Sequence, residues 1–196
     1  MDITLMSLKK ALALFITKFY YSFLFKSVGP RTAIYRPYLL HNEKYIRIGK
    51  GCLLRKGLRL EVVDPQSDVV ISIGDNVNIE QNVHIIGRVA ITIEDDVTIT
   101  GHCSIVDVVH PYNNILSSIK IGNRISEEAF PVKIGRGSFI GFGAHISPGV
   151  KIGKYCVVGA NSVVTKSMPD YSVVAGNPAR ILKLYDFESN SWVVCS

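Results

Sequence analysis

His110 is a residue of this 196-residue chain that could act as a general base, because the reference pKa of an imidazole lies close to neutral pH. Pro111 follows it directly, and Asp107 stands three residues before it, near enough in sequence to orient the imidazole. An acid in such a place is more often simply solvated, and a loop histidine can equally have an ordinary surface role. Position alone leaves both interpretations of each residue open.

The four cysteines give no sign of metal or thiol chemistry. Cys52, Cys103, Cys156 and Cys195 are separated by 51, 53 and 39 residues, which fits neither a close metal-binding pair nor a short disulfide framework. No serine or cysteine stands in a recognisable nucleophile motif. We therefore expect no metal and no acyl-enzyme, and a reducing compartment such as the cytosol.

A six-residue period sets the elements that position these residues. In its clearest stretch an aliphatic residue recurs at Ile134, Ile140, Ile146, Ile152, Val158 and Val164. The same phase returns from Ile73 to Ile85 and from Ile93 to Ile105, with a weaker trace from Ile48. The period fits neither a helix nor a simple two-faced strand. It fits a short strand and a turn repeated around a prism, with a small residue such as Cys103 near each corner, and so predicts a parallel β-helix.

Two breaks in the period show where the chain leaves this prism. The step from Ile85 to Ile93 has eight residues, which predicts a small bulge at one corner. The step from Ile105 to Ile134 has 29, so the segment 107–131 must protrude as a loop with His110 at its root. Loops that interrupt a rigid scaffold often carry function.

The N-terminal segment 5–25 is strongly apolar, but Lys9, Lys10 and Lys18 interrupt it, so it predicts neither a membrane-spanning helix nor a cleaved signal peptide. On a helix, one face carries Leu8, Leu12, Phe15, Ile16, Phe19 and Phe23. This face could lie on an anionic membrane, helped by the nearby Lys26, Arg31 and Arg36. It could equally pack on the rest of the protein or on a neighbouring subunit, and the composition fits both.

The net charge of +6 does not indicate nucleic-acid binding. Residues 1–59 hold 12 of the Lys and Arg residues against two acids, whereas residues 60–196 hold more acids than bases. The basic excess therefore belongs to the apolar N-terminal part, which has no nucleic-acid reading motif.

The hexapeptide series, the loop with a histidine at its root and the C-terminal run VVGANSVVTKSMPDYSVVAGNPARILK together resemble the hexapeptide-repeat O-acetyltransferases. The resemblance covers residues 73–185 and is greatest to the galactoside and maltose acetyltransferase branch and its relatives that modify bacterial surface polysaccharides. It implies a left-handed parallel β-helix assembled as a homotrimer, with active sites between subunits. It also implies acetyl-CoA as donor and a sugar hydroxyl as acceptor. The cysteine pattern and the N-terminal helix together predict a location in the cytoplasm, where the helix could contact the inner face of the membrane.

The expected organisation has three parts. An N-terminal helix and lead-in occupy residues 1–47, and the β-helix occupies residues 48–168 with its loop at 107–131. A C-terminal segment on the CoA side occupies residues 169–196.

The resemblance also implies roles for individual residues. His110 takes the place of the catalytic histidine. We expect the backbone at Gly141 and Phe142 to contact the thioester region of CoA, and the turn Gly159-Ala160 to contact the pantetheine arm. The nucleotide end and its phosphates are expected to meet Thr165, Lys166, Arg180 and Lys183. Lys183 stands where the family usually has a second arginine, and Phe142 where it often has a small polar residue.

The acceptor side matches the family less well. The sugar acetyltransferases have an asparagine that positions the acceptor, and its place falls near Glu80 in this sequence. We expect Asn82, two residues later and on the same strand face, to bind the acceptor together with Asp107. The family's N-terminal acceptor segment has no match in residues 1–47. The acceptor is therefore not expected to be the small free sugar of the best-known relatives.

The expected mechanism is direct transfer in a ternary complex, with His110 as base and a backbone N–H near Gly141 or Phe142 stabilising the oxyanion. Two alternatives remain: N-acetylation of an amino-sugar nucleotide, and a catalytically silent β-helix that binds a partner. A zinc carbonic anhydrase of the same fold class is disfavoured, because the histidines of the helical region lack the ligand spacing.

Overall fold

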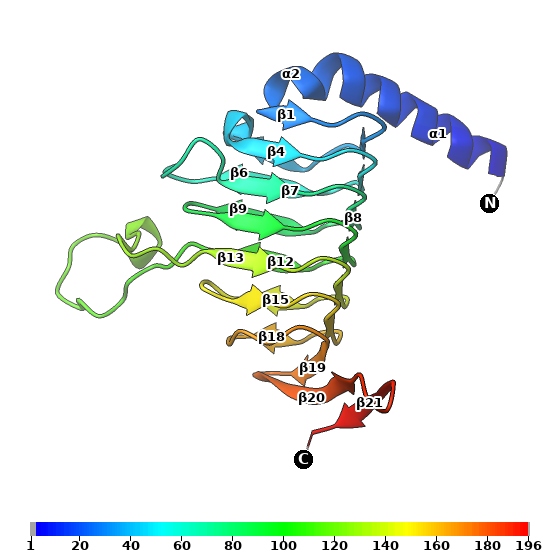
Figure 1. Ribbon diagram of the computed structural model, residues 1–196. Coiled ribbons are helices and arrows are strands. Elements are labelled where there is room, and N and C mark those ends of the chain that lie inside the picture. Colours follow the sequence, from blue (N-terminus) through cyan, green and yellow to red (C-terminus); the bar gives the residue numbers. More distant parts are fainter. Residues whose placement is uncertain (1–2, 196) are drawn as a thin grey trace.

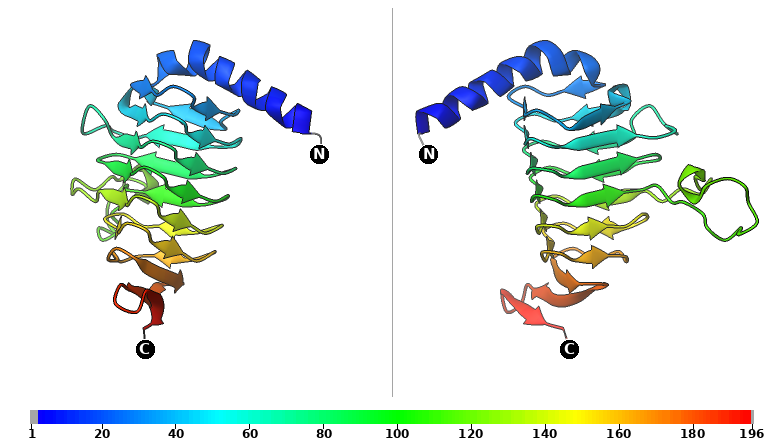
Figure 2. Two further views of the ribbon diagram at one scale, coloured as in Figure 1. Left: turned by 45° about the vertical axis from the view of Figure 1, so that its right-hand side comes forward. Right: turned by 180° about the vertical axis from the view of Figure 1, so that it is seen from behind.

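The computed structural model describes residues 3–195, and residues 1, 2 and 196 of the predicted terminal segments lie outside the described residues. The chain forms a left-handed parallel β-helix, as predicted, with three sheets as the faces of a prism (Figures 1 and 2). A helical segment covers one end of the prism, and a long loop projects from its side. A short antiparallel extension follows the last coil.

Each coil contributes one strand to each sheet. Sheet A consists of β1 (Ser27–Val28), β4 (Ile46–Ile48), β7 (Ile71–Ile73), β10 (Ile91–Ile93), β13 (Val132–Ile134) and β16 (Lys151–Ile152). Sheet B consists of β2 (Ala33–Ile34), β5 (Leu53–Leu54), β8 (Asn78–Ile79), β11 (Thr98–Ile99), β14 (Phe139–Ile140), β17 (Val157–Val158) and β19 (Ser172–Gly176), extended by the antiparallel β20 (Ala179–Asp186) and β21 (Ser191–Val194). Sheet C consists of β3 (Leu39–His41), β6 (Arg59–Val62), β9 (His84–Gly87), β12 (Ser104–Val106), β15 (His145–Ile146) and β18 (Val163–Val164).

The repeat aliphatics form stacked columns inside the prism. In sheet A, for example, Ile73 pairs in register with Ile93, which pairs with Ile134, and all three are almost completely buried. Burying each such side chain stabilises the fold by about 1.5–3 kcal/mol. Each coil thus covers the apolar face of its neighbour, and no coil needs a separate core.

The small residues of the repeat lie just inside the corners. Cys52, Cys103 and Cys156 are buried and unpaired, which agrees with the predicted packing role. Burial raises the pKa of each of these thiols, so they stay protonated. One coil before Cys156 at the same corner, the Ser138 hydroxyl donates to the Gly153 carbonyl and accepts the Cys156 N–H.

The three corners of the prism differ in how they turn. At the corners from sheet A to sheet B and from sheet B to sheet C, tight turns place one residue in the left-handed region, such as Gly137 with φ 69° or Asn161 with φ 56°. The corner from sheet C to sheet A instead accepts the insertions, namely residues 42–45, 63–70, 88–90 and 107–131. The eight-residue step is therefore a bulge at this corner, stacked between two longer loops.

The prism begins earlier than the predicted boundary at residue 48. Strands β1, β2 and β3 form a complete first coil that pairs in parallel with β4, β5 and β6. Its aliphatics Val28, Ile34 and Leu40 keep the six-residue spacing. An eight-residue step from Leu40 to Ile48, like the one after Ile85, conceals this coil in the sequence.

Helix α1 (Ile3–Ile16) continues through a π-helical turn (Thr17–Tyr21) into α2 (Ser22–Leu24). The C-terminal part of this segment covers the N-terminal end of the prism, and the rest of α1 projects past its edge (Figure 1). The buried side of the helix is formed by two small residues one turn apart, Ala13 and Thr17. The Thr17 hydroxyl donates to the Ala13 carbonyl at 2.7 Å and accepts the Ile34 N–H at 2.8 Å. This hydrogen bond pairs a backbone group at the open end of sheet B.

Most of the apolar face predicted for this helix is exposed, although Leu12 and Ile16 also line a cavity between the helix and the prism. Its members have exposed fractions between 37% and 80%, and they are Leu8, Leu12, Phe15, Ile16, Phe19 and Phe23. We call this set the apolar stripe. Burial of the stripe against its own chain, one of the two expectations, is therefore wrong, because the small residues Ala13 and Thr17 make the buried contact.

Candidate active site at two corners of the prism

The root of the protruding loop is fixed by Asp107, the first residue after β12. Its buried carboxylate accepts the backbone N–H groups of Arg88, Val89 and Ala90 at 2.6, 2.9 and 2.8 Å. Burial raises the pKa of this carboxyl, and the three hydrogen bonds oppose that shift. Asp107 thus ties the long loop to the bulge of the preceding coil.

His110 lies further along the loop with an exposed side chain. Its Nδ1 lies 2.7 Å from the backbone carbonyl oxygen of Arg124. A carbonyl can only accept, so Nδ1 must carry a proton and donate it, which leaves the Nε2 lone pair of the neutral imidazole available to accept another. His110 is therefore held in the tautomer that a general base needs.

Arg124 also organises the loop around this histidine. Its guanidinium donates to the carbonyl oxygens of Ile119 at 2.8 Å, Asn114 at 2.9 Å and Ser117 at 3.3 Å. One residue thus fixes the loop with its side chain and the imidazole with its carbonyl. The sequence analysis missed it, although Arg124 is the one arginine in segment 107–131.

The expectation that Asp107 orients His110 is wrong. Both carboxylate oxygens of Asp107 are occupied by backbone N–H groups, and the imidazole takes its hydrogen bond from the Arg124 carbonyl instead. The three-residue spacing suggested a contact that the loop, once it leaves the strand, does not make.

The residues expected to meet the thioester and the pantetheine arm lie at the corner between sheets B and C. Gly141 and Gly159 are equivalent in successive coils, and each donates its N–H to the next rung, to Val158 and Val174 respectively. Gly141 is therefore not free to stabilise an oxyanion. The N–H groups of the next residues, Phe142 and Ala160, have no hydrogen-bond acceptor within residues 3–195.

These two N–H groups stand one coil apart on an exposed edge. They can bind the carbonyl groups of an extended ligand that runs along the prism. The Phe142 ring is itself half exposed and lies 5.0 Å from the His102 ring. Phe142 stands at the position where the family often has a small polar side chain.

The expected phosphate-binding residues lie near the C-terminal end of the prism. Lys166 and Arg180 line one cavity of about 510 Å³ at that end, and Thr165 precedes Lys166 on the surface. Lys183 lies further along β20 and does not line this cavity. The structure therefore brings together two of the three predicted basic side chains.

Asn82 was expected on a strand face, but it lies in a turn. It is the left-handed residue of the turn after β8, with φ 57°, and its amide nitrogen lies 3.3 Å from His102 Nε2. Glu80, two residues earlier, pairs with Arg55 at 2.9 Å. Asparagine tolerates this backbone conformation well, which explains its presence without an acceptor.

The two groups of predicted site residues stand at different corners of the same chain. His110 projects from the corner between sheets C and A, whereas Phe142 and Ala160 lie at the corner between sheets B and C. The strands of sheet C separate these corners. A single chain therefore does not bring His110 and these backbone N–H groups together.

Comparison with known proteins shows the family of this chain. Residues 131–166 match the family model described as bacterial transferase hexapeptide (six repeats). The chain is 35% identical over 160 residues to WbbJ of Escherichia coli K12, a protein named as a lipopolysaccharide biosynthesis O-acetyl transferase, and the match covers 80% of each chain. The chain belongs to the hexapeptide-repeat acetyltransferases. The predicted family and the predicted enzyme class are thereby confirmed.

Other relatives of this acetyltransferase agree with the assignment. It is 36% identical over 121 residues to the galactoside O-acetyltransferase of Escherichia coli K12, a match that covers 59% of this chain and 57% of that relative. A maltose O-acetyltransferase from Clostridium difficile 630 has a similar structure, with a TM-score of 0.53, 25% identity, and 94% and 90% of the two chains covered. AntD, an N-acyltransferase from Bacillus cereus, shares the fold with a TM-score of 0.71 at 20% identity, over 88% and 90% of the chains.

Two further observations concern residues 3–195 of this acetyltransferase. No group of three or more His, Cys, Asp or Glu side chains is placed there so that it could hold a metal ion. None of the helices in this range is both long and apolar enough to cross a membrane.

Proposed function

We propose that this acetyltransferase transfers the acetyl group of acetyl-CoA to a sugar hydroxyl in a bacterial surface polysaccharide. The observation that carries the proposal is the hydrogen bond from His110 Nδ1 to the Arg124 carbonyl, because it leaves Nε2 as a base on an exposed loop. The similarity to WbbJ, named for lipopolysaccharide biosynthesis, supports the acceptor class.

In the proposed reaction, His110 Nε2 accepts the proton of the acceptor hydroxyl while that oxygen forms a bond to the acetyl carbon. The carbon–sulfur bond of the thioester breaks, and the proton returns from His110 to the leaving sulfur. The Phe142 N–H is the donor that we assign to the developing oxyanion, because the Gly141 N–H is already bonded. Transfer is direct, and no acyl-enzyme forms.

Two features fit the binding of CoA: backbone N–H groups without an acceptor, and basic side chains at one cavity. Phe142 and Ala160 offer unpaired N–H groups to the amides of the pantetheine arm, alongside the glycine-containing turns at Gly141 and Gly159. Lys166 and Arg180 face one cavity and would hold phosphates, with Thr165 and Lys183 nearby. CoA in the complexes of AntD is consistent with this assignment.

The active form that we propose is a homotrimer with each site between two chains. The separation of His110 from Phe142 and Ala160 across sheet C supports it, because a neighbouring chain can place its loop against the corner between sheets B and C. A monomer in light scattering that is fully active would contradict this assembly.

The decisive experiment replaces His110. His110→Ala is expected to reduce acetyl transfer by about 10²–10⁴-fold, the usual contribution of a general base, with the assembly and CoA affinity unchanged. His110→Asn is the matched control for geometry, since its amide can still donate to the Arg124 carbonyl but cannot act as a base. Near-normal turnover in either variant would refute the mechanism.

N-acetylation of an amino-sugar nucleotide is the second candidate, and the fold shared with the N-acyltransferase AntD is the observation that favours it. Assays with paired acceptors that differ only in an amino or a hydroxyl group separate the two. Acetylation of the amino member alone would replace our proposal.

We also propose that the apolar stripe of α1 contacts the inner face of the cytoplasmic membrane. The exposure of the stripe supports this contact, since large apolar side chains that face away from their own protein favour an interface. Pelleting with phospholipid vesicles tests it, and a protein that stays in the supernatant would contradict it.

A further inference from the structure

A cavity of about 440 Å³ lies between helix α1 and the first two coils of the prism. Leu12, Ala13 and Ile16 line it from the helix and Ile34 lines it from β2, so much of its wall is apolar. Its volume is within the usual range for small-molecule sites. The catalytic proposal does not use it.

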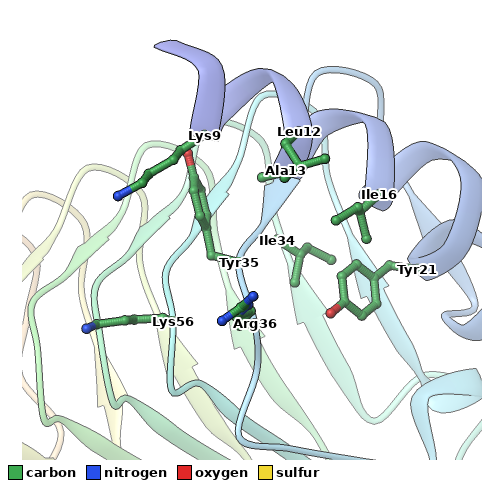
Figure 3. Close-up of a pocket in the computed structure, with 9 residues that line it drawn as sticks. All are labelled: Lys9, Leu12, Ala13, Ile16, Tyr21, Ile34, Tyr35, Arg36 and Lys56. Atoms are coloured by element: carbon green, nitrogen blue, oxygen red, sulfur yellow. The ribbon is translucent and has the colours of Figure 1, made fainter. Parts of the chain in front are cut away.

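Three basic side chains surround this cavity. Lys9 comes from the helix, and Arg36 and Lys56 come from turns of the first and second coils. Figure 3 shows Lys9, on the helix, and Lys56, on the prism, extending to the same side of the cavity. No acidic residue lines the cavity.

These three cations also lack the ion pairs that their neighbours have. Lys50 pairs with Asp75 and Arg55 pairs with Glu80, but Lys9, Arg36 and Lys56 form no salt bridge with any of residues 3–195. Positive charges that line one cavity without a counter-charge favour binding of an anion. The charge and the apolar wall together select a ligand with an anionic head and a hydrocarbon chain.

The cavity shares Leu12 and Ile16 with the apolar stripe of the same helix. Lys9 and Lys18 flank the stripe on its two sides at helical spacing, an arrangement typical of helices that lie in a membrane interface with lysines reaching the headgroups. An interface position of α1 would bring the cavity to the depth of the lipid phosphates.

We propose that this cavity binds one anionic phospholipid, with its phosphate on Lys9, Arg36 and Lys56 and its upper acyl chain on Leu12, Ala13, Ile16 and Ile34. The proposal rests on the membrane contact of the stripe proposed above. A free phosphate would leave the apolar wall unused, and a second copy of this chain would have to bring an acidic segment to the three cations.

The first test compares vesicles of phosphatidylcholine with and without phosphatidylglycerol. Arg36→Gln/Lys56→Gln is expected to weaken binding to the anionic vesicles more than tenfold, because each cation near such a surface contributes about fivefold. Lys151→Gln/Lys154→Gln removes the same charge from exposed positions in the sixth coil, at the opposite end of the prism. It should change binding by less than about twofold, since charges beyond a screening length contribute little. Equal losses in the two variants would overturn a site at the cavity.

The second test needs no membrane. Short-chain phosphatidylglycerol, kept below its micelle concentration, should bind to the wild-type protein with one molecule per chain in calorimetry. Binding should be lost in Arg36→Gln/Lys56→Gln, and short-chain phosphatidylcholine and inorganic phosphate should not bind. Equal binding of inorganic phosphate, or unchanged binding by the double variant, would overturn the proposal.

A third test separates the membrane contact of the apolar stripe from lipid binding in the cavity. Phe15→Ser/Phe23→Ser removes two exposed members of the stripe and leaves the cavity intact. It should lose vesicle binding and keep binding of the short-chain lipid, which supports both proposals. A lower molar mass for this variant in light scattering would show that the stripe packs between copies of this chain, and it would overturn the lipid assignment.

Discussion

His110 and Arg124 are joined by a hydrogen bond of 2.7 Å between the imidazole Nδ1 and a backbone carbonyl. The same arginine holds three other carbonyls of the loop through its guanidinium. The order of the loop and the tautomer of His110 therefore depend on one residue. Displacement of Arg124 would affect the His110 imidazole, even though the guanidinium of Arg124 does not bond to that ring.

Arg124→Ala is predicted to lower kcat/KM by about 10–100-fold while CoA affinity is retained. The variant loses three hydrogen bonds from a charged donor, each contributing about 1.5–3 kcal/mol, so the loop samples conformations in which His110 is out of place. Steady-state kinetics measure the loss, and hydrogen exchange over residues 107–131 should show faster exchange.

Two further variants make this prediction specific. Arg124→Lys keeps the charge but not the three-way geometry, and should recover only part of the activity. Lys120→Ala removes a cation from the same loop whose side chain makes no hydrogen bond or ion pair with residues 3–195, and should behave like wild type. Equal losses at positions 120 and 124 would show that loop charge, and not the Arg124 contacts, is responsible.

Replacing the basic residues of the C-terminal cavity is predicted to weaken CoA binding unequally. Lys166→Ala and Arg180→Ala should each raise the Kd for CoA by about 10–100-fold, because each removes a charged partner of a phosphate. Lys183→Ala should have the smaller effect, since Lys183 does not line the cavity. Calorimetry with CoA and with 3′-dephospho-CoA measures these changes. A Lys183→Ala effect equal to the others would place the phosphates along β20 instead.

The prism could be predicted from the sequence because its information is local and periodic. Every coil repeats the same requirement for an aliphatic residue, so Ile99 and Ile140 reveal their neighbours by spacing alone. The same period also contains the turn positions: three places after the repeat aliphatic, the chain adopts left-handed angles at Asn76, Asn82 and Asn161. The turn position of Asn82 could therefore have been deduced, and its assignment to a strand was avoidable.

The parts of the site that could not be predicted depend on contacts without a period. Asp107 bonds to backbone N–H groups 17 to 19 residues earlier, and backbone groups leave no trace in the side-chain pattern. Arg124 reaches loop carbonyls that are fixed only once the loop has folded. Sequence reasoning located His110 through the break in the repeat, but could not identify what holds it.

Asp107→Asn is predicted to lower the free energy of unfolding by about 1–3 kcal/mol. The amide retains one acceptor oxygen where the carboxylate offered two, so at least one buried N–H of residues 88–90 loses its partner. Chemical denaturation measures the change. Asp170→Asn is the matched control, because exposed Asp170 accepts a single N–H from Lys154 and should cost less. A smaller effect at position 107 than at position 170 would contradict the anchoring role.

The last prediction concerns pH and the outward face of sheet C. Burial lowers the pKa of His145, whose Nδ1 lies 2.7 Å from the Ser104 hydroxyl. The folded state therefore binds a proton less readily than the unfolded state, whose histidine titrates near 6.5. The free energy of unfolding should fall as the pH drops below about 6.5, because the unfolded state takes up the extra proton there.

His145→Gln removes this contribution, so its free energy of unfolding should depend less steeply on pH in that window than that of the wild type. Denaturation at a series of pH values and one protein concentration measures the slope. His84→Gln should act in the same direction, since burial, and then Arg59 and His102, lower the pKa of His84. If both variants kept the wild-type slope, acid sensitivity would have to arise from groups outside this face of the prism.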